Sequence, residues 1–341
     1  MYFLIVLLSL NFSNQNLDSI ADIKNISVYP QEGQSIRAIT VVSDKEIHFA
    51  SDQGFYGKTM DSGENWDLQK VYFKEKAVAF RSIAKTENNL FLLSIATPAL
   101  LYKFSQNTEE LVYQEYGESV FYDAMSINEN GVGIAIGDPD QHGMRIIRSE
   151  DYGNTWQRIL ADDMPKAIQG EGAFAASNSN LKQIDDRTYF ISGGILSRFY
   201  RSIDNGKTWT CSELPLINNK ATTGAYTMDF YNKNIGIVAG GDYMNKSARF
   251  KTMALTKDGG LSWQLVSAAN SPGYVSCIQY LPNSDGNTLV AISVEGLYIS
   301  NDGGQTWKTI PDIEGYYTIR FLNNKTAWIA GVNKLAKIEF Y

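Results

Sequence analysis

Arginine, carboxylate and tyrosine side chains recur in this sequence on short strand-like segments and in the small-residue turns beside them. Arg37 and Arg81 lie within two such segments, whereas Asp138 and Asp242 follow others directly after glycine. A guanidinium can clamp a carboxylate through two parallel hydrogen bonds, and a carboxyl group can donate or accept a proton. These residue types therefore indicate a site for a polar or acidic ligand.

Further side chains join this set from neighbouring segments. Glu171 lies in a glycine-rich turn between two strand-like segments, and Asp123 lies on such a segment. We expect the set to meet at one mouth of a closed sheet and to bind a protein segment or a small polar ligand. The alternative for each residue is a solvated channel lining without a ligand. The predicted binding residues are Arg37, Arg81, Asp123, Asp138, Glu171, Asp242 and Tyr243.

The elements that must position these residues are marked by a motif that occurs five times. Its pattern is hydroxyl-x-Asp-x-Gly-x-(small polar)-Trp, and five of the six tryptophans close a copy. The carboxylate can accept bonds from turn N–H groups, the glycine can adopt φ > 0 in a hairpin, and the tryptophan can anchor packing between sheets. We predict a structural role for the motif carboxylates Asp61, Asp151, Asp204, Asp258 and Asp302.

The spacing of the motifs predicts a β-propeller. Successive motif aspartates are 90, 53, 54 and 44 residues apart, and the interval of 90 corresponds to two units. Repeats of about 40 to 50 residues are typical of propeller blades. A degenerate unit fits within the long interval, with residues 105–108 in the place of the motif.

The two ends of the chain are expected to share one blade. Three strand-like segments follow the last motif, at 317–322, 326–330 and 335–340, and residues 23–29 form another near the start. An N-terminal strand that closes the ring would remove exposed sheet edges. The sequence thus predicts an all-β, seven-bladed propeller of four-stranded antiparallel blades, closed by an N-terminal strand.

Strand direction assigns the turns to two faces. Successive strands of a blade alternate in direction, so the motif turn and the first turn of each blade share one face, here called the motif face. The turns between second and third strands and the connections between blades share the other, here called the mouth face. The predicted binding residues belong to the mouth face.

The first segment differs from the rest of the chain. Residues 2–10 form an apolar run that is too short to span a bilayer and suits the core of a signal peptide. We predict a signal peptide over residues 1–16, a single propeller domain over 17–341, and a periplasmic or secreted location. A buried N-terminal strand is the alternative.

Composition argues against several classes of function. The formal net charge of −7 disfavours nucleic-acid binding, which calls for a basic face. With only two histidines, His48 and His142, neither a metal centre nor a cofactor is expected. Cys211 and Cys277 are predicted to be separate buried thiols. We expect a monomer without a transmembrane helix.

The motif resembles the Asp-box, or BNR repeat, of sialidases and related propellers. Phrases such as Ile136-Gly137-Asp138-Pro139, residues 170–177 and Gly240-Gly241-Asp242-Tyr243 also resemble bacterial relatives of the photosystem II stability/assembly factor propellers. That resemblance covers residue 25 to the end and implies a scaffold that binds a membrane-protein precursor through an arginine-rich surface. Some such relatives are labelled oxidoreductases, but the glycines of residues 131–137 run through a strand with no helix to follow, which disfavours a nucleotide loop.

The resemblance to sialidases implies a second function, an exported glycoside hydrolase. Such an enzyme would use an arginine cluster, a tyrosine activated by a glutamate, and an aspartic acid as proton donor. The Arg-Ile-Pro phrase of the first sialidase strand is replaced here by Arg37-Ala38-Ile39. The implied residues are Asp138 as acid, Glu171 with Tyr317 or Tyr226, and Arg37, Arg81 and Arg198 or Arg320 as the cluster. We predict a non-catalytic binding or assembly scaffold, with the hydrolase as the alternative.

Overall fold

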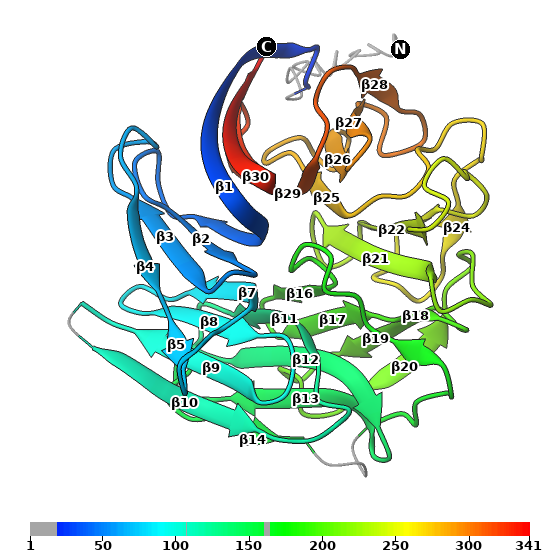
Figure 1. The fold of residues 1–341 in the computed structure, drawn as a ribbon. Helices are drawn as coiled ribbons and strands as arrows, with labels where there is room; N and C mark the ends of the chain where they lie inside the picture. The colour runs from blue at the N-terminus through cyan, green and yellow to red at the C-terminus, as the bar shows by residue number, and fades with distance from the viewer. Residues whose placement is uncertain (1–18, 107, 160–163) are drawn as a thin grey trace, which may run out of the picture.

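The computed structural model describes residues 19–106, 108–159 and 164–341. These residues form β-strands joined by turns, and none of them lies in an α-helix. The sheets surround a common axis (Figure 1), so the predicted all-β propeller is confirmed. The predicted signal peptide, residues 1–16, lies outside the described residues.

One six-stranded sheet joins the two ends of the chain, in the order β29 (Tyr316–Asn323), β30 (Thr326–Phe340), β1 (Ile23–Val41), β2 (Ile47–Ser51), β3 (Phe55–Thr59), β4 (Asp67–Lys70). Next along the chain come a two-stranded hairpin and two four-stranded sheets. Their strands are β5 (Tyr72–Phe73) and β6 (Lys76–Ala77); β7 (Phe80–Lys85), β8 (Leu90–Ser94), β9 (Ala99–Phe104) and β10 (Glu109–Glu115); β11 (Tyr122–Ile127), β12 (Gly133–Asp140), β13 (Gly143–Ser149) and β14 (Gln157–Arg158).

The remaining strands form two four-stranded sheets and a second six-stranded one. The four-stranded sheets contain β16 (Leu181–Ile184), β17 (Arg187–Ile191), β19 (Arg198–Ser202) and β20 (Thr210–Glu213), and β25 (Cys277–Tyr280), β26 (Leu289–Ser293), β27 (Gly296–Ser300) and β28 (Lys308–Ile310). The six-stranded sheet has the order β15 (Glu171–Gly172), β18 (Gly193–Gly194), β21 (Thr223–Phe230), β22 (Gly236–Asp242), β23 (Met253–Thr256), β24 (Gln264–Leu265).

Seven strands lie nearest the axis, and we call them the inner strands. These inner strands contact one another in the cyclic order β1, β7, β11, β16, β21, β25, β29 and back to β1. Second strands are buried between neighbouring sheets, as β8 and β26 are at every residue. Burial on both faces explains why these strands are continuous apolar runs rather than alternating ones.

Strands β1 and β30 both change partners along their length. β1 pairs with β30 from Ile23↔Phe340 to Pro30↔Lys334, and further along it pairs with β2. Gly33, between these two parts, has a φ of +74°. In β30 the N–H of Phe340 donates to the carbonyl of Lys325 at 2.8 Å, so this strand folds back on itself. Asn333, with a φ of +60°, lies at the fold.

The motif turns share one hydrogen-bond pattern. In the copy at Thr256, the hydroxyl donates to Asp258 at 2.7 Å and accepts the N–H of Gly260 at 2.9 Å. Asp258 also accepts the N–H of Ser262 at 2.9 Å and its hydroxyl at 2.5 Å. In every copy the residue after the aspartate donates its N–H to the first turn of the same sheet, the pairs being Ser62 to Lys45, Tyr152 to Gly131, Asn205 to Asp186, Gly259 to Asn234 and Gly303 to Asn287. The motif turn and the first turn therefore lie together on the motif face.

The motif glycines also set the spacing between sheets. Gly260 has a φ of +83°, and a Cβ there would lie 2.2 Å from the ring of Phe199 in the preceding sheet. A Cβ on Gly63 would likewise lie 2.7 Å from Trp328. Only glycine satisfies both the backbone conformation and this approach, which explains its presence in every copy.

Asp258→Ala is expected to lower the free energy of unfolding by about 1–2 kcal/mol at neutral pH, because several turn donors lose a partly exposed charged acceptor. These hydrogen bonds lower the pKa of Asp258 to about 2. Its stabilisation is therefore present above the unfolded pKa of about 3.9 and is lost as pH falls towards 2. Urea unfolding between pH 7 and pH 2 tests both statements. Glu129→Ala, an exposed acid on the same face, is the control; equal losses in the two variants would contradict a structural role for the motif carboxylate.

Candidate functional site

Arg37 and Arg81 lie where the inner strands β1 and β7 enter the ring from the mouth face. The Arg37 guanidinium lies 3.6 Å above the ring of Tyr317, and its Nη1 donates to the carbonyl of Ala176 at 2.9 Å. Arg81 makes no hydrogen bond or ion pair within the described residues. Burial, and secondly the charge of Arg37, lower the pKa of Arg81 to about 10. Two like charges thus share a partly buried site, and the nearby carboxylate of Asp52 opposes their effect on the pKa of Arg81 only in part and forms no ion pair with it.

An aromatic group lies beside this arginine pair. Phe174 stacks on Tyr226 with ring centroids 4.0 Å apart, and Tyr226 meets Tyr274 edge-on at 4.9 Å. Tyr243 lies 6.3 Å from Tyr226 and is exposed. Ala176, whose carbonyl accepts the bond from Arg37, packs against Phe174, Tyr226 and Tyr274, which places the aromatic group beside Arg37. The mouth therefore combines two arginines with the accessible rings of Phe174 and Tyr243.

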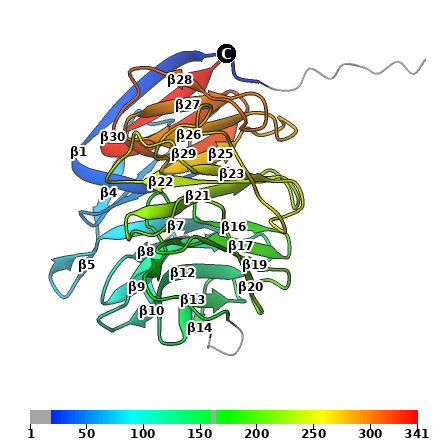
Figure 2. The same cartoon turned by 90° about the vertical axis from the view of Figure 1, so that its right-hand side faces the viewer.

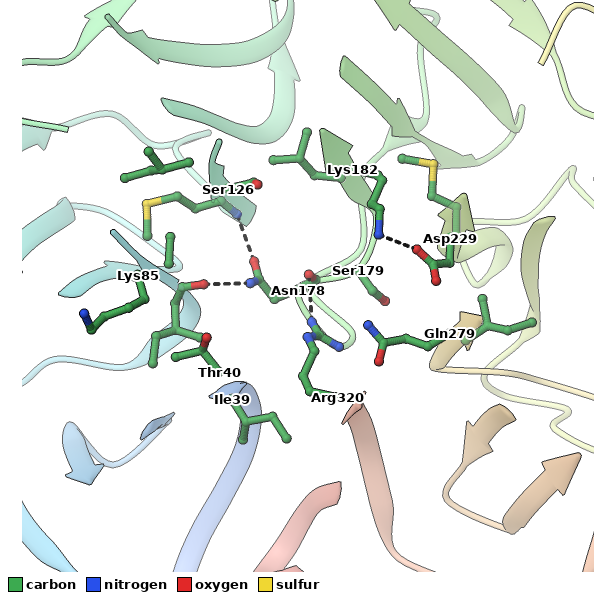
Figure 3. A pocket seen from close by; sticks show the side chains of 17 residues that line it. Ile39, Thr40, Lys85, Ser126, Asn178, Ser179, Lys182, Asp229, Gln279 and Arg320 are labelled. Atoms are coloured by element: carbon green, nitrogen blue, oxygen red, sulfur yellow. Dashed lines mark hydrogen bonds and ion pairs between the residues drawn. The ribbon is translucent and has the colours of Figure 1, made fainter. Parts of the chain in front are cut away.

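A short segment before β16, residues 176–179, crosses the axis and closes the channel; we call it the plug. Asn178, with a φ of +55°, lies at the centre of the ring of strands (Figure 3). Plug atoms bond to β1, β7, β11, β21 and β29, and to the residue before β25. These bonds are Arg37 to the Ala176 carbonyl, Asn178 to Ile83 and Met125, Ser179 to Thr227, Arg320 to the Ser177 and Asn178 carbonyls, and Ser177 to the Ser276 carbonyl. The plug separates the mouth from the motif face.

The plug also forms the floor of a pocket of about 220 Å³ on the motif-face side (Figure 3). The Lys182 Nζ lies 2.7 Å from a carboxylate oxygen of Asp229, and Lys85 donates to two carbonyls of its own turn. Arg320 donates to plug carbonyls. The charged groups of this pocket are satisfied by the protein, whereas Arg81 at the mouth is not. For this reason the mouth is the stronger candidate site.

Asp123 and Asp138 form a close pair of carboxylates behind the mouth. Asp123 is fully buried, and the backbone N–H of Ala175, which lies beyond ordinary hydrogen-bond geometry, only partly offsets the burial of its carboxyl group. Burial and the neighbouring Asp138 raise the pKa of Asp123 well above its usual range. Asp138 accepts the N–H of Ala173 at 2.9 Å, and burial raises its pKa as well. Burial therefore favours the neutral form of Asp123, and it keeps the carboxyl group out of reach of a ligand.

Glu171, also predicted at the mouth, lies buried within a sheet. It accepts from Arg198 Nε at 2.9 Å, and a second bond joins Arg198 Nη2 to the other carboxylate oxygen. Tyr200 donates to it at 2.7 Å, as do Ser192 and the N–H of Ile168. These bonds hold the carboxylate in place as part of the fold.

The glutamate–tyrosine pair therefore differs from the one inferred by resemblance. Tyr317 contacts Arg37, and Tyr226 donates to the carbonyl of Thr222 at 2.8 Å. Burial, and secondly Glu171, raise the pKa of Tyr200 far above its usual range. A tyrosine that is buried and resists ionisation is poorly suited to act as a nucleophile.

The last predicted carboxylate, Asp242, is also buried. It accepts the N–H of Met244 at 3.0 Å and lies 3.8 Å from the ammonium of Lys220. The structure thus brings Arg37, Arg81 and Tyr243 to one mouth with exposed or half-buried side chains, and holds Asp123, Glu171 and Asp242 as internal groups. Cys211 and Cys277 are both free thiols, as predicted, but only Cys277 is buried, since Cys211 on β20 is partly exposed.

Two functional features were missed from the sequence, the plug and the aromatic group. The run Ala175-Ala176-Ser177-Asn178-Ser179-Asn180 occupies the place of the start of an inner strand, and β16 is only four residues long. Small polar residues before a shortened inner strand were the available signal. The stacking of Phe174 on Tyr226 had none, because Phe174 lies outside the strands and is far in sequence from Tyr226 on β21.

Fold and motif define the class of this protein as a β-propeller with Asp-box turns. The BNR/Asp-box repeat model matches residues 298–309, and the model described as sortilin, neurotensin receptor 3, matches residues 144–277. No curated protein sequence matches the chain. The described residues contain no helix long and apolar enough to cross a bilayer.

Solved structures with the same fold include photosystem II assembly-factor propellers. A structure of YCF48 bound to D1 peptide has a TM-score of 0.67 and 15% identity, and the match covers 95% of this chain and 100% of the other. YCF48 from Cyanidioschyzon merolae has a TM-score of 0.62 and 15% identity, over 92% and 98% of the chains. The WD40 propeller domain of Doa1 has a TM-score of 0.62 and 13% identity, over 93% and 96%. These matches show the β-propeller fold of this chain.

Proposed function

We propose that this chain is a non-catalytic binding or assembly scaffold that holds an acidic protein segment at its mouth. The observation that carries the proposal is the partly buried arginine pair, in which Arg81 has no protein partner and its pKa is lowered by burial and by Arg37. A ligand carboxylate would relieve this repulsion and could be held bidentately. The relative bound to a D1 peptide supports a protein segment as the ligand.

Phe174 and Tyr243, whose rings are not buried, would hold the rest of the segment, and the buried rings of Tyr226 and Tyr274 would support them from beneath. Phe174, Tyr226 and Tyr274 form a packed apolar cluster with Ala176, and Tyr243 extends it to solvent. Aromatic rings bind apolar parts of a peptide at little cost in side-chain entropy. The plug closes the channel beneath, so the segment would lie across the mouth and would not thread through the ring.

Replacing both Arg37 and Arg81 with alanine is expected to weaken binding of an acidic peptide by about 100-fold, since two charge-assisted contacts are lost. The probe is a peptide array that varies acidic residues and the terminal carboxylate, followed by fluorescence anisotropy on the tightest peptide. Arg37→Lys with Arg81→Lys should recover only part of the affinity, because an ammonium cannot form the bidentate contact.

Lys207→Ala is the matched control, because this exposed cation lies on a motif turn at the opposite face. The proposal would be contradicted if no peptide bound. It would also be contradicted if the tightest peptide bound the parent protein and the double alanine variant with equal affinity.

We also propose that the ring has seven blades closed by the N-terminal strand. The cyclic order of the inner strands supports this count, as does the fold-back of β30, which would divide the sheet shared by β29, β30 and β1 to β4 into two four-stranded blades. In this arrangement residues 23–30 are the outer strand of the last blade and residues 35–41 the inner strand of the first. Export of a monomer, with residues 1–16 as the signal peptide, completes the proposal.

A further inference from the structure

Two groups of aromatic and basic side chains project from the mouth face. The first, here the hairpin projection, comprises residues 70–76, which include β5 and follow β4, together with Tyr116. The second, here the loop projection, comprises residues 243–251, which join β22 to β23, together with Lys220. The hairpin projection follows β4, a fourth strand, and the loop projection follows β22, a second strand. Because strands of both kinds end on the mouth face, both projections lie on the same side of the disc as Arg37.

Both projections expose large apolar side chains. Tyr72 is 55% exposed and Tyr116 60% in the hairpin projection, and Met244 is 74% exposed and Phe250 61% in the loop projection. Such side chains seldom lie together on a soluble surface without a partner. Figure 2 shows β5 extending away from the side of the disc.

Cations accompany these rings closely. Lys70 lies 5.7 Å from the Tyr72 ring centroid, Lys74 lies 5.9 Å from that of Tyr116, and Lys251 lies 5.3 Å from that of Phe250. The cations are Lys70, Lys74 and Lys76 in the first projection, with Glu75 and Glu118 nearby, and Lys220, Lys246, Arg249 and Lys251 in the second, with Asp242 and Glu295 nearby. Cations outnumber carboxylates at both projections, although the chain as a whole has a net charge of −7.

The loop projection is held in shape by its backbone. The carbonyl of Lys246 accepts the N–H of Tyr274 at 2.7 Å, and that of Lys251 accepts the N–H of Ile217 at 2.8 Å. The hairpin projection is anchored by the N–H of Val71, which donates to Gly54 at 2.9 Å, and by the pairing of β5 with β6. These backbone bonds fix both projections, so that their apolar side chains are held at the surface.

We infer that the mouth face docks on an anionic lipid bilayer through these two projections. They belong to distant sheets, with β5 and β22 on opposite sides of the ring in Figure 1, so one partner that meets both must be broad and flat. Exposed rings beside ammonium groups suit the interface of a bilayer, where the rings enter the headgroup region and the cations meet anionic lipid. The motif carboxylates lie on the opposite face, which orients the disc with its mouth towards the membrane.

The test is flotation of the full chain with vesicles of phosphatidylcholine, with and without about one third phosphatidylglycerol. We expect binding only to the anionic vesicles and its loss at high salt. Replacing Lys246, Arg249 and Lys251 with glutamine should reduce binding by about tenfold or more, as should Met244→Ser with Phe250→Ser. Tyr72→Ser with Lys74→Gln tests the hairpin projection in the same way.

Leu261→Ser is the matched control, because this leucine is 70% exposed on a motif turn at the opposite face. The apolar run of residues 2–10 is common to all variants, so a difference between them reports on the projections. Equal binding to both kinds of vesicle would overturn the inference. So would binding that the loop and hairpin variants leave unchanged, or capture of a protein alone with no affinity for lipid.

This inference stands apart from peptide binding at the arginine pair. The double alanine variant of Arg37 and Arg81 should still float with anionic vesicles, and the loop variants should still bind the acidic peptide in solution without lipid. Failure of one function therefore leaves the other measurable.

Discussion

Glu171→Ala is expected to lower the free energy of unfolding by about 3–5 kcal/mol, because it leaves the Arg198 guanidinium buried without its counter-charge. The carboxylate lies within a sheet and accepts bonds from Arg198, Tyr200, Ser192 and the Ile168 N–H. Each of these donors would lose an acceptor that water cannot easily replace. The midpoint of urea unfolding at neutral pH measures the loss.

Two further variants separate the buried pair from a general effect of charge. Glu171→Leu with Arg198→Met removes both charges and should recover much of the loss, since apolar replacement of a buried ion pair is often neutral. Glu150→Ala breaks the exposed pair with Arg148 and should leave stability almost unchanged. A small loss for Glu171→Ala together with loss of a hydrolytic activity would instead give Glu171 a chemical role.

Asp123→Asn is expected to stabilise the protein at pH 8 by about 1–3 kcal/mol and to flatten its dependence on pH. Burial and the adjacent Asp138 raise the pKa of Asp123 well above its usual range. The folded state therefore binds this proton more tightly than the unfolded state does. Its contribution is fully present below the unfolded pKa of about 3.9 and is lost as pH rises towards the folded pKa.

Urea unfolding from pH 4 to pH 8 tests this expectation. The parent protein should lose stability relative to Asp123→Asn as pH rises, and the difference should grow towards pH 8. In Asp138→Asn the folded-state pKa of Asp123 should fall, because the neighbouring charge is removed, so the decline should begin at the same pH and end at a lower one. Parallel pH profiles for the parent and Asp123→Asn would show that Asp123 ionises in the folded state as it does in the unfolded chain.

The motif copies allowed the architecture to be predicted because the contacts that form each turn lie within the motif itself. The hydroxyl, the carboxylate and the glycine contact one another within a few residues, as at Thr256, Asp258 and Gly260. A Cβ on Gly260 would clash with Phe199 of the preceding sheet, so the glycine links this local turn to the packing of the ring. Period and turn chemistry therefore pointed to the same fold.

The site was harder to predict because its contacts join distant segments. Asn178 bonds to Ile83 and Met125, which belong to two other sheets, and no local pattern specifies those partners. Placement of Glu171 near the mouth followed from its turn, but its side chain points to Arg198 on β19, which belongs to another sheet. Arg37 and Arg81 could be placed because their positions on inner strands follow from the repeat alone.

Pairing between β1 and β30 has a consequence for the order of folding. Ile23 meets Phe340, so residues 23–30 of β1 cannot pair with β30 until residues 334–340 have been synthesised, although the later part of β1 can already pair with β2. Closing so long a loop is slow and entropically costly. Until then the unpaired edge of residues 23–30 can associate with other chains. That exposure ends when residues 334–340 pair with it.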